Sequence, residues 1–143
     1  GGDNHVDDIE HKKQIEIMNK IYLGITVENY KKVIQELNAK INSYKNQDKK
    51  KNKLDEETII KNEELYEKLV VSKLQCFYCS RPVKIIYNYI RDDFQWTLDR
   101  IDNAIGHSNE NTVVCCLKCN LQRRVTDAKK FEFTKKLKIV KEN

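Results

Sequence analysis

Hydrophobic residues recur at three- and four-residue intervals through the first half of the chain. The clearest series consists of Val27, Tyr30, Ile34, Leu37, Ile41 and Tyr44, and a weaker series before it consists of Met18, Ile21, Tyr22 and Ile25. This spacing places the apolar residues on one face of an amphipathic helix. The sequence therefore predicts two helices here, with Thr26 as the N-cap of the second.

Nine consecutive polar residues at 45–53 interrupt this periodicity and predict an exposed link or a frayed helix end. Helical spacing resumes over 54–74, where acidic residues lie near the start, lysine lies near the end, and the apolar positions are Ile59, Tyr66, Leu69, Val70 and Leu74. The resulting helical hairpin could pack on the rest of the chain, or bind a partner or a second copy. Internal packing is the commoner fate of an apolar helix face.

The second half of the chain predicts strands, because it is rich in β-branched and aromatic residues. The predicted strands are 84–90, 94–101 and 111–115, with a turn at Asp92 and Asp93. Residues from 117 onward predict a helix. Phe94 and Trp96 alternate on one strand and fit a core better than a platform for stacked bases.

The predicted fold class is therefore α+β. We expect a helical extension over 1–75, a compact module over 76–125 and a basic C-terminal helix over 126–143, which begins at a new N-cap near Thr126.

Composition narrows the class of protein. Only 39% of the residues are hydrophobic and 34% are charged, so the core must be modest. No apolar run approaches the length of a membrane span and no leader pattern is visible. We therefore expect a soluble intracellular protein, cytoplasmic or nuclear, with no membrane partner.

Positive charge is concentrated in the second half of the chain. Residues 1–75 hold 14 lysines and 14 acidic residues, whereas residues 76–143 hold 13 basic and 8 acidic residues, including all five arginines. Arginine suits bidentate contacts with phosphate, which favours a polyanion surface in this half. Charge alone fits an ordinary lysine-rich surface equally well.

Five cysteines provide the strongest motif. Cys76 and Cys79 form one Cys-x-x-Cys pair, and Cys116 and Cys119 form another after an interval of 36 residues. Two such pairs can supply four thiolates to one tetrahedral zinc ion, which would be structural because no coordination position stays open. Disulfides fit poorly because the number is odd, and redox chemistry needs only one pair. Cys115 could substitute as a ligand, but its spacing favours a small buried side chain.

The segment between the cysteine pairs contains oxygen donors. Asp99 lies on a predicted strand, and Asn120 follows the last cysteine at the start of a helix. A strand, a loop and a returning strand can bring the carboxylate and the amide oxygen together on a hard divalent cation. Such a cation could polarise a scissile phosphate. Alternatively, Asp99 could stabilise a turn and Asn120 could cap the helix.

The run "CFYC…LDRIDNAIGHSNENTVVCCLKCNLQRR" resembles the HNH, or ββα-metal (His-Me finger), endonuclease family. It is most similar to the zinc-stapled endonuclease VII-like branch, which occurs in phages and giant viruses, so a viral origin is one interpretation. The resemblance covers residues 74–125. It implies that Asp99 and Asn120 bind catalytic Mg²⁺ or Mn²⁺, that Asn111 braces the loop, and that the protein hydrolyses DNA.

Residue 100 departs from the family pattern, which has the general-base histidine directly after the metal-binding aspartate. Arg100 cannot act as a base because its guanidinium stays protonated. His107 could take that role, although bracing the loop or contacting phosphate is the commoner use of such a histidine. Arg100 could instead clamp phosphate.

Three functions follow. The first is a metal-dependent DNA endonuclease, in which Arg100, Lys118, Arg123 and Arg124 contact the nucleic acid. The second is a zinc-stapled nucleic-acid-binding module that has lost its base. The third is an interaction protein, or a homodimer, that associates through its N-terminal helices. Arg123 and Arg124 could also be plain solvated charge. The joint presence of Asp99, Asn111 and Asn120 favours the enzyme.

Overall fold

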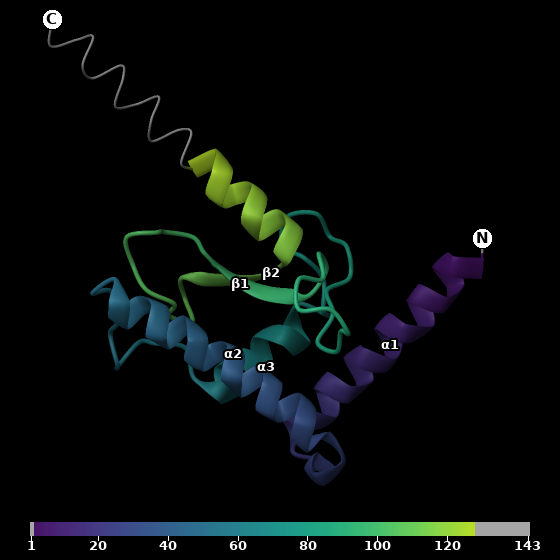
Figure 1. Ribbon diagram of the computed structural model, residues 1–143. Helices are drawn as coiled ribbons and strands as arrows, with labels where there is room; N and C mark the ends of the chain where they lie inside the picture. Colours follow the sequence, from purple (N-terminus) through teal and green to yellow (C-terminus); the bar gives the residue numbers. More distant parts are fainter. Residues whose placement is uncertain (1, 128–143) are drawn as a thin grey trace, which may run out of the picture.

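The first half of the chain is helical. The computed structural model describes residues 2–127. The helical elements are α1 (Gly2–Leu23), the short 3-10 helix η1 (Val27–Tyr30), α2 (Lys31–Lys50) and α3 (Asn62–Val71). The arms α1 and α2 diverge from η1 like a V (Figure 1). α3 contacts both of them, so the three helices form one packed unit.

A two-stranded antiparallel sheet follows the helices. β1 spans Trp96–Arg100 and β2 spans Thr112–Cys116, and Asp99 lies opposite Val113. Residues 117–127 form a helix directly after β2, which we call the C-terminal helical segment. The sheet lies between α2 and this segment (Figure 1). The predicted mixed α+β class is thus confirmed.

One hydrophobic core joins the helices to the sheet. The buried cluster includes Met18, Ile21, Leu37, Ile41, Leu65, Leu69, Trp96, Leu98 and Val114. Trp96 and Leu98 alternate with Thr97 and Asp99 along β1, so one face of the strand enters this core and the other faces the C-terminal helical segment. Most residues of the apolar stripes predicted for the helices therefore pack inside the chain, whereas Tyr22, Ile25 and Val27 are exposed.

Polar side chains of α2 also contact the sheet. Lys40 donates hydrogen bonds to Gln95 Oε1 (2.8 Å), to the Tyr87 hydroxyl (3.3 Å) and to the carbonyl of Trp96. One turn later, the Tyr44 hydroxyl accepts a hydrogen bond from the Leu98 amide (3.1 Å). These contacts anchor α2 along β1 at a four-residue interval.

The predicted link over 45–53 is wrong, because α2 continues to Lys50 and residues 45–50 form its end. Most of them are exposed as predicted, but the Asp48 side chain is only 1% exposed. Its carboxylate is buried because His107 supplies hydrogen bonds to both of its oxygens. Sequence periodicity cannot reveal this, because the partner is 59 residues away.

The predicted strand at 84–90 is also wrong. Only Lys84 pairs with β-structure, through an isolated bridge to Gln95. The amides of Ile85 and Ile86 instead donate to Gln14 Oε1 of α1, at 2.8 and 3.2 Å. A side chain from a helix therefore takes the hydrogen bonds that a neighbouring strand would need.

The third predicted helix is shorter than expected, because α3 begins only at Asn62. Before it, the Ile60 amide donates to the carbonyl of His107 (2.9 Å), and Ile59 forms an isolated bridge with Ser108. Thr26 makes no side-chain cap and has a left-handed backbone with φ of 48°. The predicted C-terminal helix over 126–143 lies mostly outside the described residues.

Within the described part of the chain, no helix combines the length and the apolar character that a membrane crossing requires.

Candidate functional site

The four predicted zinc ligands converge at one point. The Sγ atoms of Cys76, Cys79, Cys116 and Cys119 all lie within 4.8 Å of one another. The Cys79 amide points at Cys76 Sγ (3.5 Å) and the Cys119 amide points at Cys116 Sγ (3.4 Å), as expected where thiolates are bound by a metal. Tetrahedral coordination with metal–sulfur bonds of about 2.3 Å would separate the sulfurs by about 3.8 Å. The cluster could therefore hold a metal ion with little rearrangement.

Cys115 is not part of this cluster. Its side chain is 0% exposed, and its Sγ contacts the Thr97 hydroxyl at 3.2 Å. Burial raises the pKa of the Cys115 thiol to about 12. It is the small buried side chain that its strand position predicts.

A polar cavity of about 430 Å³ lies beside the sheet. Its lining includes Asp99 and Arg100 of β1, His107 of the connecting loop, and Asn120 of the C-terminal helical segment. The sequence separates these residues by up to 21 positions. The β1–loop–β2–helix path brings them to one surface, which was expected for Asp99 and Asn120.

Asp99 is held by two neighbours and keeps one oxygen available. Its Oδ2 accepts hydrogen bonds from the Tyr78 hydroxyl (2.5 Å) and from Arg123 Nε (2.7 Å). No hydrogen bond from residues 2–127 reaches Oδ1. Burial and the hydrogen bond to Asp99 raise the pKa of Tyr78, and the same carboxylate raises the pKa of Arg123. The carboxylate is thus oriented, with Oδ1 left for another ligand.

Asn120 is anchored to the sheet through its amide nitrogen. Nδ2 donates to Thr97 Oγ1 (3.1 Å) and to the carbonyl of Leu98 (3.3 Å), and the side chain is only 4% exposed. Its Oδ1 receives no hydrogen bond from the described residues. Asp99 and Asn120 both line the cavity, and each has one side-chain oxygen that accepts no hydrogen bond from residues 2–127.

His107 is fixed in orientation by α2. Asp48 Oδ1 lies 2.7 Å from His107 Nδ1, and Asp48 Oδ2 accepts the His107 backbone amide at 2.7 Å. The imidazole stacks on the Tyr44 ring, with centroids 4.6 Å apart. Burial lowers the pKa of His107, an effect that Asp48 opposes and that Arg100 and Arg124 reinforce. Burial therefore favours the neutral ring, and no hydrogen bond from the described chain reaches Nε2.

The loop between the strands is organised by Asn111. Its Oδ1 accepts the Asp102 amide (2.9 Å), and its Nδ2 donates to the carbonyls of Asp102, Ile105 and Gly106 at 2.9–3.3 Å. Arg100 reinforces the loop through Nη1, which lies 3.3 Å from the carbonyl of Asn103. The loop that carries His107 is thus held by side-chain contacts at both ends.

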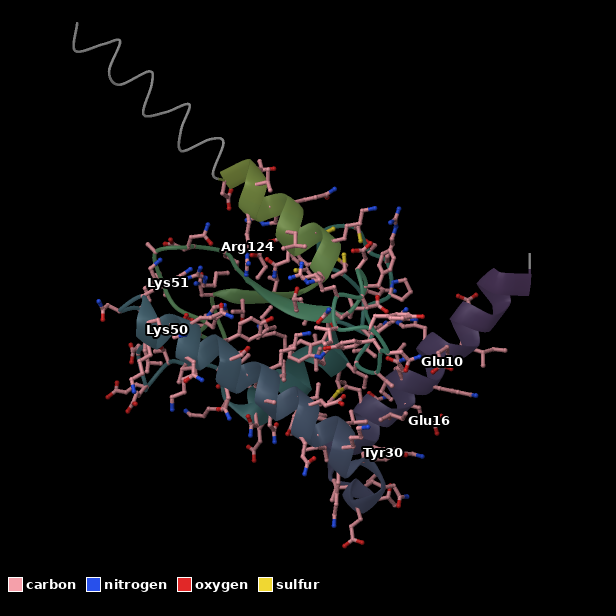
Figure 2. All side chains as sticks on the ribbon, viewed as in Figure 1. Glu10, Glu16, Tyr30, Lys50, Lys51 and Arg124 are labelled. Carbon is pink, nitrogen blue, oxygen red and sulfur yellow. The ribbon has the colours of Figure 1, made fainter. Side chains whose placement is uncertain are left out.

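The basic residues predicted to contact nucleic acid differ in their exposure and in their neighbours. Arg124 is exposed and lines the cavity, and Lys118 is exposed outside its lining. Arg123 pairs with Asp99 and lies over the Tyr78 ring at 4.7 Å. Figure 2 shows Arg124 and Lys51 on the same side of the molecule, and both line the cavity.

Sequence reasoning missed Asp48 and Tyr78. Asp48 follows Leu37, Ile41 and Tyr44 at helical spacing, which places it on the buried face of the helix but does not identify His107 as its partner. Tyr78 lies inside the first cysteine pair, where nothing in the motif distinguishes it.

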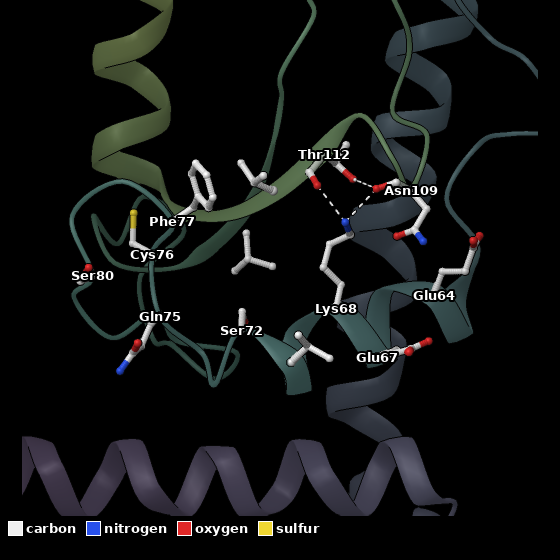
Figure 3. Close-up of a pocket in the computed structure, with 13 residues that line it drawn as sticks. Glu64, Glu67, Lys68, Ser72, Gln75, Cys76, Phe77, Ser80, Asn109 and Thr112 are labelled. Atoms are coloured by element: carbon white, nitrogen blue, oxygen red, sulfur yellow. Dashed lines mark hydrogen bonds between the residues drawn. The ribbon is translucent and has the colours of Figure 1, made fainter.

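A second pocket lies between α3 and β2 (Figure 3). Lys68 Nζ donates to the carbonyls of Asn109 and Thr112, both at 2.8 Å. These bonds tie α3 to the end of the loop. Of the predicted site residues, this pocket is lined only by Cys76, and the Lys68 contacts are structural.

Comparisons with known proteins find no matching family model, curated protein or solved structure.

Proposed function

We propose that this protein is a metal-dependent endonuclease of the HNH type that hydrolyses DNA phosphodiester bonds. The observation that supports it best is the shared cavity of Asp99, His107 and Asn120, which come from a strand, a loop and a helix. Two of these residues offer oxygen donors and the third offers a neutral imidazole. This is the set of groups that metal-assisted phosphodiester hydrolysis requires.

The cysteine cluster would hold structural zinc. Four thiolates form a soft donor set, which suits zinc better than magnesium or calcium. The two pairs flank the segment that contains β1, the loop and β2, so the ion would fasten both ends of that segment. All four ligand positions are occupied by sulfur, so substrate would have no place on this ion.

The oxygens of Asp99 and Asn120 fit a hard divalent cation such as Mg²⁺ or Mn²⁺. When bound, this ion would polarise the scissile phosphate and stabilise the leaving oxygen. Tyr78 and Arg123 hold Asp99 Oδ2, and Thr97 holds the Asn120 amide. The ligating oxygens are therefore oriented before any ion arrives.

His107 would act as the general base. Its unbonded Nε2 accepts the proton of the attacking water while the water oxygen attacks phosphorus. A neutral ring is needed for this, and burial keeps the pKa of His107 low. Arg100, Arg124 and Lys51 line the same cavity and supply positive charge for a phosphate backbone.

A zinc-stapled DNA-binding module without cleavage is the second candidate. Two observations favour it: arginine stands at position 100, and the Arg123 guanidinium already pairs with the Asp99 carboxylate. Partner binding or dimerisation through the helices has weaker support, because most residues of their apolar stripes are at least partly buried. The exposed apolar side chains of the described helical half are Tyr22, Leu23, Ile25 and Val27 around η1, Ile9 of α1 and Val71 of α3.

Cleavage of supercoiled plasmid and of branched DNA with Mg²⁺ or Mn²⁺ tests the proposal. Asp99→Asn removes the carboxylate and should lower the cleavage rate on the order of 10²-fold or more. Asp93→Asn is the matched control, because Asp93 is exposed and outside the cavity lining. Full cleavage by Asp99→Asn would reject the ion site. Salt-sensitive DNA binding without cutting by the native protein would favour the second candidate.

A further inference from the structure

Asp48 is the most completely buried charged side chain among the described residues. It belongs to α2, which lies outside the segment 74–125 that resembles HNH endonucleases. Its side chain is 1% exposed, yet no lysine or arginine within residues 2–127 pairs with it, and its only salt-bridge contact there is with His107, which carries a charge only when protonated. Burial of a carboxylate is costly unless hydrogen bonds satisfy it. Both oxygens of Asp48 are committed to His107, one to the backbone amide and one to the ring. The α2 terminus thus carries a charged group whose only side-chain partner is the histidine of the cavity.

The loop that carries His107 lies in close contact with the end of α2 at Gly106. A Cβ placed on Gly106 would lie 2.7 Å from Asp48 Oδ2 and 2.5 Å from the carbonyl of Lys53. Only glycine allows the loop to approach α2 so closely. Tyr44 supports the imidazole face from one turn earlier on the same helix, at a centroid distance of 4.6 Å. The ring is therefore fixed by contacts on its face, its backbone and Nδ1.

We infer that Asp48 is a positioning residue that holds the His107 ring as the Nδ1–H tautomer and turns Nε2 into the cavity as the proton acceptor. The inference rests on the proposed function for its role in cleavage, but not for the tautomer itself. A carboxylate only accepts hydrogen bonds, so the proton of the Asp48–His107 contact must lie on Nδ1. In the neutral ring Nε2 then has a free electron pair. The helical half of the chain would thereby complete a site whose other groups lie on the sheet and the C-terminal helical segment.

The pair also explains how a chain with Arg100 could retain a base. His107 lies seven residues after Arg100, on a loop whose shape is set by Asn111. The charged or titratable groups that face the ring are Asp48 and Tyr44 of α2, Arg100 of β1 and Arg124 of the C-terminal helical segment. Among them, only Asp48 hydrogen bonds to the imidazole.

Nitrogen-15 NMR of the full chain tests the tautomer directly, with the His107 signals identified by their loss in His107→Gln. The native protein near pH 7.5 should show a protonated Nδ1 and an unprotonated Nε2. Asp48→Asn should reverse this, because the amide of Asn can donate to Nδ1 and leave the proton on Nε2. Asp55→Asn is the matched control, since Asp55 also accepts a backbone amide but is outside the cavity lining.

Plasmid cleavage with Mn²⁺ then tests the role. Asp48→Asn should lower kcat on the order of 10²-fold, with KM for DNA nearly unchanged. An Nε2–H tautomer in the native protein would overturn the inference even if Asp48→Asn fails to fold. An inverted tautomer with unchanged kcat would overturn it too. A native protein that shows the Nδ1–H tautomer but cuts no DNA would overturn the proposed function and still support the control of His107 by Asp48.

Discussion

The cysteine cluster and the polar face of α2 both hold the small sheet, but they do so in different ways. The four cysteines come from two short segments, each with the same internal spacing, and they meet at one point. The contacts of α2 come from Lys40, Tyr44 and Asp48, which lie at four-residue intervals along one helix. Each reaches a different partner 54 to 59 residues later in the chain.

The cysteine cluster and the α2 contacts therefore have different roles: the first joins two ends of a segment, and the second orient individual groups. The cysteine cluster could hold a metal ion that fastens both ends of the segment containing the sheet, and its four ligands are of one type. The α2 contacts instead fix particular groups: the start of β1, the amide of Leu98 and the imidazole of His107. Loss of the first should unfold the sheet region, whereas loss of the second should leave a folded sheet with a displaced cavity.

The largest expected effect is that of Cys116→Ser. It removes one of four thiolates and should abolish stoichiometric zinc binding, with a loss of stability on the order of 5 kcal/mol or more, because structural zinc contributes directly to folding. Elemental analysis and thermal unfolding measure both effects. Cys115→Ala is the matched control next to it and should keep zinc at a cost of about 1 kcal/mol. Zinc lost from Cys115→Ala but kept by Cys116→Ser would show that the ligand set is wrong.

An intermediate effect is expected for Gly106→Ala, which forces α2 and the loop apart. The added methyl group would clash with the carbonyl of Lys53 and with Asp48 Oδ2, so we expect a loss of about 2 kcal/mol and shifted His107 signals, with zinc retained. Chemical denaturation and NMR provide the measurements. Gly24→Ala is the control, because it meets nothing within 4 Å and adds only the strain of a φ of +71°, about 1 kcal/mol. Unchanged His107 signals in Gly106→Ala would contradict the close contact.

The smallest effect concerns pH and Lys40. Burial lowers the pKa of Lys40 from 10.5 to about 7 in the folded chain. Between these values the unfolded chain holds a proton that the folded chain lacks, so stability should rise as the pH increases from about 7 toward 10.5. We expect a rise on the order of 1 kcal/mol from pH 7.5 to 9, measured by urea denaturation. Lys40→Met should show a flatter dependence, and an equal slope in both proteins would contradict the shift.

Local sequence patterns predicted the parts of the molecule that depend on local spacing. The stripe of Leu37, Ile41 and Tyr44 is buried, and the strands lie at Trp96–Arg100 and Thr112–Cys116 within or close to the predicted ranges. The convergence of the four cysteines follows from their spacing as well. These features need only periodicity and the geometry of one ligand type.

The remaining features depend on contacts between distant residues. The run at 84–90 has strand composition, but Gln14 takes its amide hydrogen bonds. Asp48 lies in a polar run, and only its four-residue spacing from Tyr44 distinguishes it from its exposed neighbours Lys49 and Lys50. Its burial depends on hydrogen bonds from His107, which lies on the loop between β1 and β2. Sequence reasoning could therefore name His107 as a candidate, but could not find the group that orients it.

The Asn111 side chain has a consequence for protein engineering. Because it sets the path of the loop through backbone atoms of Asp102, Ile105 and Gly106, most side chains of that loop do not determine its shape. Ile101 and Ile105 are 60% and 51% exposed. These two positions can therefore carry new side chains, such as a spectroscopic label or a group that reads DNA bases, close to the cavity and without rebuilding it.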